Sequence, residues 1–157
     1  MAEASGITVI GVGNDYRGDD AIGLTAARKL KERVGPNIKV LEHDGDGAGL
    51  VECWKNSERV IVMDAVHSDA EPGSVFRFDV AAWSAPERFF SHSTHAFGVA
   101  QAVELARALN QLPQALIIYG VEGKNYDAGA TLSAEARQGI DQIVEQSFSE
   151  IQSWIEG

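Results

Sequence analysis

Two carboxylates and one imidazole stand at positions where they could bind a metal ion or take part in the hydrolysis of a bond. Asp20 follows a glycine-rich turn, Asp64 ends the apolar run 60–63, and His95 begins an apolar helical pattern. Aspartate and histidine together make an open, mixed oxygen–nitrogen site that suits zinc or nickel and leaves positions for water or substrate. Each residue also has a purely structural interpretation, and the spacing alone does not bring the three together.

The remaining histidines are reserve candidates for the same site. His67 lies three residues after Asp64, and His43 ends the second apolar run. His92 forms a His-x-x-His spacing with His95, a pattern that is common by chance. The chain contains neither His-Glu-x-x-His nor Gly-x-Ser-x-Gly, so the usual zinc-protease and serine-hydrolase motifs are missing.

The loop that carries Asp20 has the context of a nucleotide-binding loop but not its key residues. Gly13 and Gly18 have the separation found in phosphate-binding loops. Asp19 and Asp20 stand where that loop requires Lys and Ser or Thr, and two carboxylates at a helix N-terminus repel phosphate. Tyr16 stands where the dinucleotide fingerprint needs glycine. We therefore predict no nucleotide at this loop. The structural alternative is that Asp19 and Asp20 cap the helix that follows.

Short apolar runs alternate with amphipathic stretches along the chain. The pattern predicts strands at 7–12, 38–41, 60–63, 74–80 and 116–121, and helices at 20–34, 50–54, 95–109 and after a capping Ser133. It is typical of an α/β three-layer sandwich, in which helices cover both faces of a twisted, mostly parallel five-stranded sheet. We expect the alternating segment 74–80 to be an antiparallel edge strand. Sites in such sheets form in the loops at the carboxyl ends of the strands.

Length, composition and charge restrict the class of protein. The 157 residues, 45% of them hydrophobic, fit a single domain spanning 1–157. The net charge of −10 argues against a nucleic-acid partner. No apolar stretch approaches the ~20 residues of a membrane span, and residues 1–6 lack a signal-peptide pattern. We expect a cytoplasmic monomer without membrane contact, in which the single cysteine, Cys53, is a packed side chain.

Short motifs recur at fitting spacing along nearly the whole chain. They are Gly11-Val12-Gly13-Asn14, Gly18-Asp19-Asp20-Ala21-Ile22-Gly23, Asp44-Gly45, Gly47-Ala48-Gly49, Val62-Met63-Asp64-Ala65, His95 with Gly98, Gly120-Val121-Glu122 and Leu132-Ser133. Together they resemble the nickel–iron hydrogenase maturation endopeptidases. Ala21 stands where many members have glycine, which is a small departure from the family pattern.

The resemblance implies a fold, an activity and a set of site residues. The fold is a twisted, mostly parallel sheet between helices, and the activity removes the C-terminal extension of a nickel-loaded hydrogenase large-subunit precursor. The family's metal-contacting residues are an acid in the first loop, an aspartate after the third strand and a histidine at the start of a later helix. They fall on Asp20, Asp64 and His95. Nickel would then arrive with the substrate, and other divalent metals could occupy the same ligands in vitro.

Four further residues are expected to bind substrate or to shape the loops: Asn14, Asp19, Gly45 and Gly47. Asp19 would orient the first loop or act as a base, and the two glycines would leave room for an extended substrate tail. Two alternatives stay open at this point. One is a self-contained zinc-dependent hydrolase with the same three residues, and the other is a non-enzymatic nucleotide- or metal-binding module.

Overall fold

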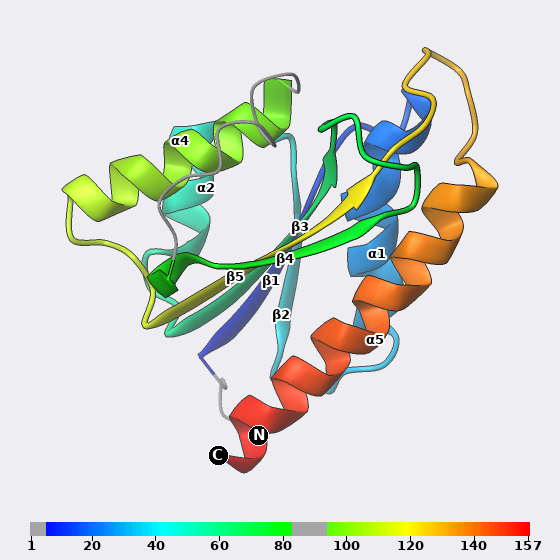
Figure 1. Ribbon diagram of the computed structural model, residues 1–157. Helices are drawn as coiled ribbons and strands as arrows, with labels where there is room; N and C mark the ends of the chain where they lie inside the picture. The colour runs from blue at the N-terminus through cyan, green and yellow to red at the C-terminus, as the bar shows by residue number, and fades with distance from the viewer. Residues whose placement is uncertain (1–5, 83–93) are drawn as a thin grey trace.

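One twisted sheet runs through the molecule and is covered by helices on both faces (Figure 1). The computed structural model describes residues 6–82 and 94–157, except for the side chains of 94–97. The strands are β1 (Ile7–Val12), β2 (Lys39–His43), β3 (Arg59–Val66), β4 (Val75–Asp79) and β5 (Ala115–Glu122). Their order is β2-β1-β3-β5-β4, and all neighbours pair in parallel except β4, which pairs antiparallel with β5. This confirms the predicted mixed sheet and its antiparallel edge strand.

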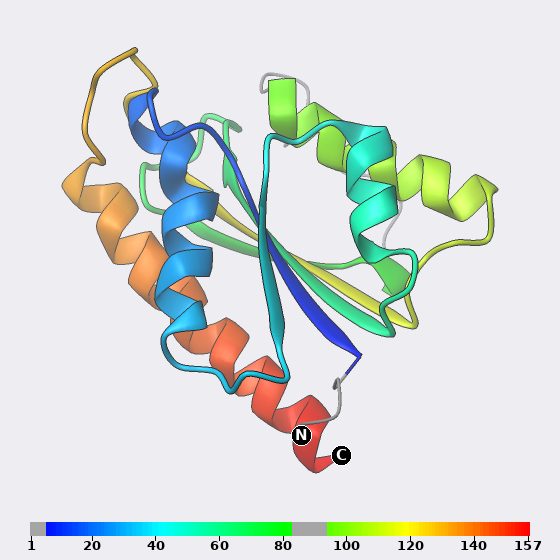
Figure 2. The same ribbon diagram turned by 180° about the vertical axis from the view of Figure 1, so that it is seen from behind.

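The helices form the two outer layers. They are the 3-10 helix η1 (Gly18–Ala21), α1 (Ile22–Lys31), α2 (Gly47–Trp54), the 3-10 turn η2 (Val80–Ala82), α4 (Thr94–Ala108) and α5 (Ala134–Glu156). Helices α1 and α5 cover one face, and α2 and α4 cover the other (Figure 2). In the described part of the chain, no helix combines the length and the hydropathy needed to cross a lipid bilayer.

Burial explains which strands are central. Every residue of β1 is buried, and so is every residue of β3 and β5 except the first, as expected for strands covered on both faces. The edge strands β2 and β4 carry exposed residues. Two apolar clusters lie on opposite sides of the sheet, one against α1 and α5 and the other against α2 and α4.

Several predicted boundaries differ from the structure by one to three residues, and three of the differences have a local cause. The predicted helix 20–34 divides into η1 and α1. The α-helix starts at Ile22, where Gly23 in its first turn packs against the ends of β1 and β3. Gly47 lies in α2 and not in a loop, since the Asp46 side chain caps that helix by accepting a hydrogen bond from the Gly49 N–H. Strand β3 continues two residues beyond Asp64, because its partner β5 extends equally far.

The carboxyl ends of β1, β2, β3 and β5 meet at one edge of the sheet, as parallel pairing requires. We call this edge, with the loops that follow these strands, the site edge. The first of these loops precedes η1, the second precedes α2, the third connects β3 to β4, and the fourth connects β5 to α5. The side chains predicted to act together come from these loops, from the strand ends and from the start of α4.

Candidate active site

Asp64 is a buried carboxylate on the α4 side of the sheet. Its side chain is 1% exposed. Along β3 it shares a face with Val60 and Val62, which pack in the same cluster as Val99 of α4. One carboxylate oxygen, Oδ1, accepts a hydrogen bond of 2.8 Å from the N–H of Ala65. The strand therefore directs this acid toward the helix that carries His95.

The first turn of α1 sits directly on the ends of β1 and β3. A Cβ at Gly23 would lie 2.2 Å from the Met63 carbonyl oxygen and 2.3 Å from that of Val12, so only glycine allows this contact. Met63 immediately precedes Asp64, and Asp20 lies three residues before Gly23. Helix η1, which carries Asp20, also contacts β3. The backbone thus brings the segments of the two predicted acids together.

The first loop is folded back on η1 by hydrogen bonds of its own. The N–H of Asn14 donates to the Asp20 carbonyl at 3.1 Å. The side-chain oxygen of Asn14 accepts from the N–H of Tyr16 at 2.9 Å, which makes a tight Asx turn. A Cβ at Gly13 would lie 2.1 Å from the Asp20 carbonyl oxygen. Asn14 therefore contributes to the shape of the loop that presents Asp20.

Asp19 connects η1 to the β5–α5 loop. It is 0% exposed, and its oxygens accept hydrogen bonds from the N–H groups of Lys124 (2.7 Å), Asn125 (3.1 Å) and Ser133 (2.8 Å). The Ser133 hydroxyl also donates to it at 2.8 Å. Burial by itself would raise the pKa of Asp19, but these hydrogen bonds outweigh it and the pKa is lowered. The capping alternative is wrong for Asp19, because its hydrogen bonds go to another part of the chain.

Glycines fix the start of α4 against the second loop. A Cβ at Gly98 would lie 1.8 Å from the Gly45 carbonyl oxygen, and a Cβ at Gly47 would lie 3.1 Å from that of Gly98. Gly45 has φ +97°, a backbone conformation that favours glycine. Gly45 and Gly47 thus face the helix that begins at Thr94, one residue before His95. The structure gives the backbone of His95 in α4, whereas its side chain and the whole of His92 lie outside the described residues.

His43 supports the same loop. Its Nδ1 accepts a hydrogen bond of 2.9 Å from the Gly45 N–H, and its carbonyl accepts one of 3.1 Å from the Gly13 N–H. His43 therefore connects the first two loops of the site edge.

Two further groups at the site edge, buried Glu122 and half-buried Tyr126, were not predicted as site residues. Glu122, 2% exposed, ends β5 and accepts hydrogen bonds from the N–H and the hydroxyl of Ser68. The Tyr126 hydroxyl donates to the Val66 carbonyl at 2.9 Å, and its ring stacks on exposed His67 with centroids 5.3 Å apart. Glu122 had two signals, its position at the end of an apolar strand and its place in the motif Gly120-Val121-Glu122, whereas nothing local marked Tyr126.

Electrostatics at the site edge is dominated by acids. Burial raises the pKa of Tyr126, and so do the nearby charges of Glu122 and Asp64. Among the side chains that the structure describes, no three His, Cys, Asp or Glu groups come together as a metal site, and His95 is not among those side chains. The described groups thus concentrate negative charge at this edge of the sheet. Cys53 is half-buried, and burial raises its thiol pKa, in agreement with a packed side chain.

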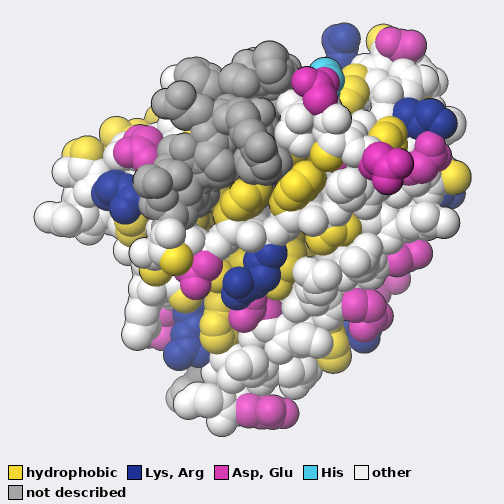
Figure 3. All heavy atoms as spheres, in the orientation of Figure 1, with side chains coloured by type: hydrophobic (Ala, Val, Ile, Leu, Met, Phe, Trp, Pro, Cys, Tyr) yellow, Lys and Arg dark blue, Asp and Glu magenta, His cyan; other side chains and the backbone are white. Residues whose placement is uncertain are grey.

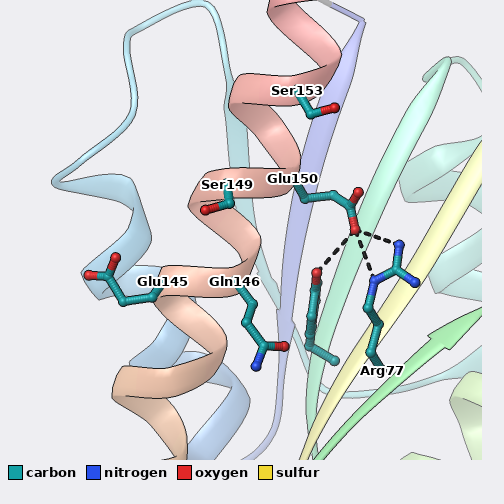
Figure 4. A pocket seen from close by; sticks show the side chains of 7 residues that line it. Arg77, Glu145, Gln146, Ser149, Glu150 and Ser153 are labelled. Atoms are coloured by element: carbon teal, nitrogen blue, oxygen red, sulfur yellow. Dashed lines mark hydrogen bonds and ion pairs between the residues drawn. The ribbon is translucent and has the colours of Figure 1, made fainter.

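A groove of about 450 Å³ lies elsewhere, on the α5 side of the sheet (Figure 4). Arg77 and Tyr119 both direct hydrogen bonds to Glu150 there, at distances of 2.7 and 3.1 Å. Burial raises the pKa of Tyr119 to about 12. In Figure 3, which views the molecule from the β4 edge, hydrophobic side chains gather over the middle between the two helical layers, and acidic ones are scattered over α5 and the loops above it. Asp64 is on the opposite side of the sheet, so this groove is not the predicted site.

Comparison with known proteins gives a consistent result over most of the chain. A family model described as HycI, hydrogenase maturation protease, matches residues 24–150. The hydrogenase expression/formation protein HupD of Bradyrhizobium diazoefficiens is 26% identical over 154 residues, covering 94% of this chain and 79% of HupD. The solved nickel–iron hydrogenase maturation protease HybD of Thermococcus kodakarensis is 28% identical with a TM-score of 0.70, covering 91% and 97% of the two chains. The hydrogenase maturating endopeptidase HybD of E. coli, 23% identical, has the same fold, with a TM-score of 0.79 and coverage of 94% and 92%.

Proposed function

Because this chain belongs to the hydrogenase maturation protease family, we propose that it removes the C-terminal extension of a nickel–iron hydrogenase large-subunit precursor after nickel insertion. The reaction is hydrolysis of one peptide bond. Water adds to the scissile carbonyl carbon, the carbon–nitrogen bond breaks, and the leaving amine takes up a proton. Family membership favours this endopeptidase over the non-enzymatic alternative.

The nickel of this proposal belongs to the substrate. Asp20, Asp64 and His95 would contact it when the precursor docks, since carboxylates and imidazole are ligands that nickel accepts. The observation that carries the assignment is the packing of the first turn of α1 against Met63, immediately before buried Asp64. The start of α4 is tied to the same edge through Gly98 and Gly45.

The chemical roles differ between the acids. Substrate-borne nickel would supply Lewis-acid polarisation of the scissile carbonyl or activation of a water molecule. Asp20, which is half-buried, lies on the loop side of the site edge, and Asp64 lies beneath it. Asp19 is not the base, because its oxygens already accept four hydrogen bonds and it is fully buried. Its role is to hold η1, and with it Asp20, against the β5–α5 loop.

A precursor-processing assay tests the proposal. Nickel-loaded large-subunit precursor is incubated with the protein, and its mass is followed over time. We expect one shortened product with the wild-type protein, and loss of processing in Asp20→Asn, Asp64→Asn and His95→Ala at unchanged circular dichroism. Asp141→Asn, which changes an ion-paired side chain 68% exposed on α5, is the matched control and should process normally. Full activity in all three site variants would overturn the assignment.

Metal analysis separates this proposal from a self-contained zinc hydrolase. We expect the purified protein to contain much less than one equivalent of zinc or nickel. One tightly bound equivalent that is lost in Asp64→Asn would instead support the zinc alternative.

A further inference from the structure

Tyr16 is a large aromatic side chain that the fold holds out in solvent. It is 80% exposed, compared with 54% for Leu109, 53% for Ile155 and 39% for Leu105, the other exposed large hydrophobic residues that the structure describes. The exposed tyrosine presents a large ring surface together with a hydroxyl, the combination that is enriched at the centres of protein interfaces. The loop that carries it is the loop that also presents Asp20.

The backbone under Tyr16 is fixed on both sides. Its N–H donates to the Asn14 side chain at 2.9 Å, and its carbonyl accepts from the N–H of Gly129 at 2.8 Å. The preceding Asp15 carboxylate is held by both terminal nitrogens of Arg28, at 2.9 and 2.8 Å. The ring is therefore carried on an ordered support, and binding against it would cost little additional chain entropy.

The same guanidinium ties this support to the sheet. Arg28 also binds the Glu42 carboxylate at the end of β2, through its Nε at 3.0 Å and a terminal nitrogen at 2.6 Å. The hydrogen bonds to Arg28 lower the pKa of both Asp15 and Glu42. The first loop is thereby joined to α1 and to β2 at once.

Tyr16 is close to the candidate active site but is not part of it. It lies four residues before Asp20, so their Cα atoms are at most about 14 Å apart. Through Gly129 the loop also contacts the β5–α5 loop, the orange segment beside η1 in Figure 1. The backbone of Tyr16 thus lies where two loops of the site edge meet, with its side chain exposed.

We propose that Tyr16 is a docking anchor for the folded body of the precursor protein, outside the tail that is cut. This inference rests on the proposed function. A scissile segment placed over Asp20 and Asp64 brings the rest of a protein substrate against the rim of the site edge. A tyrosine held there on a rigid loop has the properties of an interface hot spot, namely large contact area and few rotatable bonds.

Steady-state processing of the nickel-loaded precursor tests the anchor, with Tyr16→Ala, Tyr16→Phe and Ile155→Ala compared with wild type. Ile155→Ala removes another exposed hydrophobic side chain, near the end of α5 and far along the chain from the site edge. We expect Tyr16→Ala to raise KM about tenfold or more at nearly unchanged kcat, the size of a hot-spot loss. Tyr16→Phe keeps the ring, so its KM should stay within about threefold of the wild-type value, and so should the KM of Ile155→Ala.

The outcomes separate the two proposals. If the wild-type protein does not shorten the precursor, the proposed function fails and the anchor fails with it. If the wild type is active and Tyr16→Ala has a KM within about threefold of it, or loses no more than Ile155→Ala, only the anchor is refuted. A fall in kcat at unchanged KM also refutes it, since that result would place Tyr16 in the chemistry.

Discussion

Replacing Gly98 by alanine tests whether the start of α4 is held as close to the second loop as the geometry indicates. The new Cβ would lie 1.8 Å from the Gly45 carbonyl oxygen and 3.0 Å from its carbonyl carbon. The two backbones would have to separate by more than about 1 Å, at an overpacking cost of about 1–3 kcal/mol. Alanine is otherwise favoured over glycine inside a helix by about 1 kcal/mol, so we expect a net loss of up to about 2 kcal/mol in the free energy of unfolding.

The larger effect should appear in activity. His95 lies one helical turn before Gly98, and a shift of about 1 Å in a reacting geometry can cost about 100-fold in rate. We expect kcat/KM for the nickel-loaded precursor to fall at least about tenfold, with urea unfolding measuring the free-energy loss in parallel.

Gly35→Ala is the matched control for Gly98→Ala. It makes the same chemical change at an exposed turn, where the Cβ would meet only the Asn37 side chain at 3.1 Å. This variant should keep wild-type activity. A Gly98→Ala protein that is more stable than wild type and fully active would refute the reasoning. That result would show that the helix propensity of alanine, and not a close contact between Gly98 and Gly45, determines the effect of the substitution.

Three further predictions concern the supports of the site edge. Asp19→Asn should lower the free energy of unfolding in urea at pH 7 by about 2–4 kcal/mol, because a buried carboxylate that accepts several hydrogen bonds is replaced. The folded-state pKa of Asp19 is lowered, so its stabilising contribution is complete above about pH 4 and is lost as the pH falls further. Only the wild type should therefore show this extra loss of stability in acid. Equal slopes of the two proteins below about pH 4 would contradict this role. Arg28→Ala should lower the free energy of unfolding by less than about 1 kcal/mol at low salt and by no measurable amount in about 1 M NaCl, because its ion pairs are roughly half exposed. A loss of stability that does not depend on salt would count against the pairing. Tyr126→Phe should lower the free energy of unfolding in urea by about 0.5–1.5 kcal/mol, because the hydrogen bond from the phenol to the Val66 carbonyl is lost while the Gly123 N–H still donates to that carbonyl at 3.2 Å. No measurable loss would show that the phenol is dispensable.

The local hydrophobic pattern predicted the layers of this fold, because the pattern of each segment reflects which of its faces are buried. The nearly unbroken apolar runs of β1 and β3 mark strands covered on both faces, and the alternation in β4 marks an edge. Ser133 was predicted as a cap because its hydroxyl and the N–H of Ala136 are close in sequence. The end of β3 was not predicted, since it depends on how far β5 continues beside it.

The supports of the candidate site could not be predicted, because they join segments far apart in the chain. The partners of Asp19 lie more than 100 residues away, as the sequence separations of its hydrogen bonds with Lys124 and Ser133 show. The close approach of Gly98 to Gly45 is likewise visible only in three dimensions. The metal-contacting role of Asp20, Asp64 and His95 and the monomeric state stay predictions.

Processing of precursor with and without nickel tests the central claim most directly. One preparation of large-subunit precursor is divided, one part is loaded with nickel, and both are incubated with equal amounts of the wild-type protein. We predict a shortened product only from the nickel-loaded part, with none from the nickel-free part until nickel is restored. Equal shortening of both parts would contradict the claim that Asp20, Asp64 and His95 act on nickel brought by the substrate.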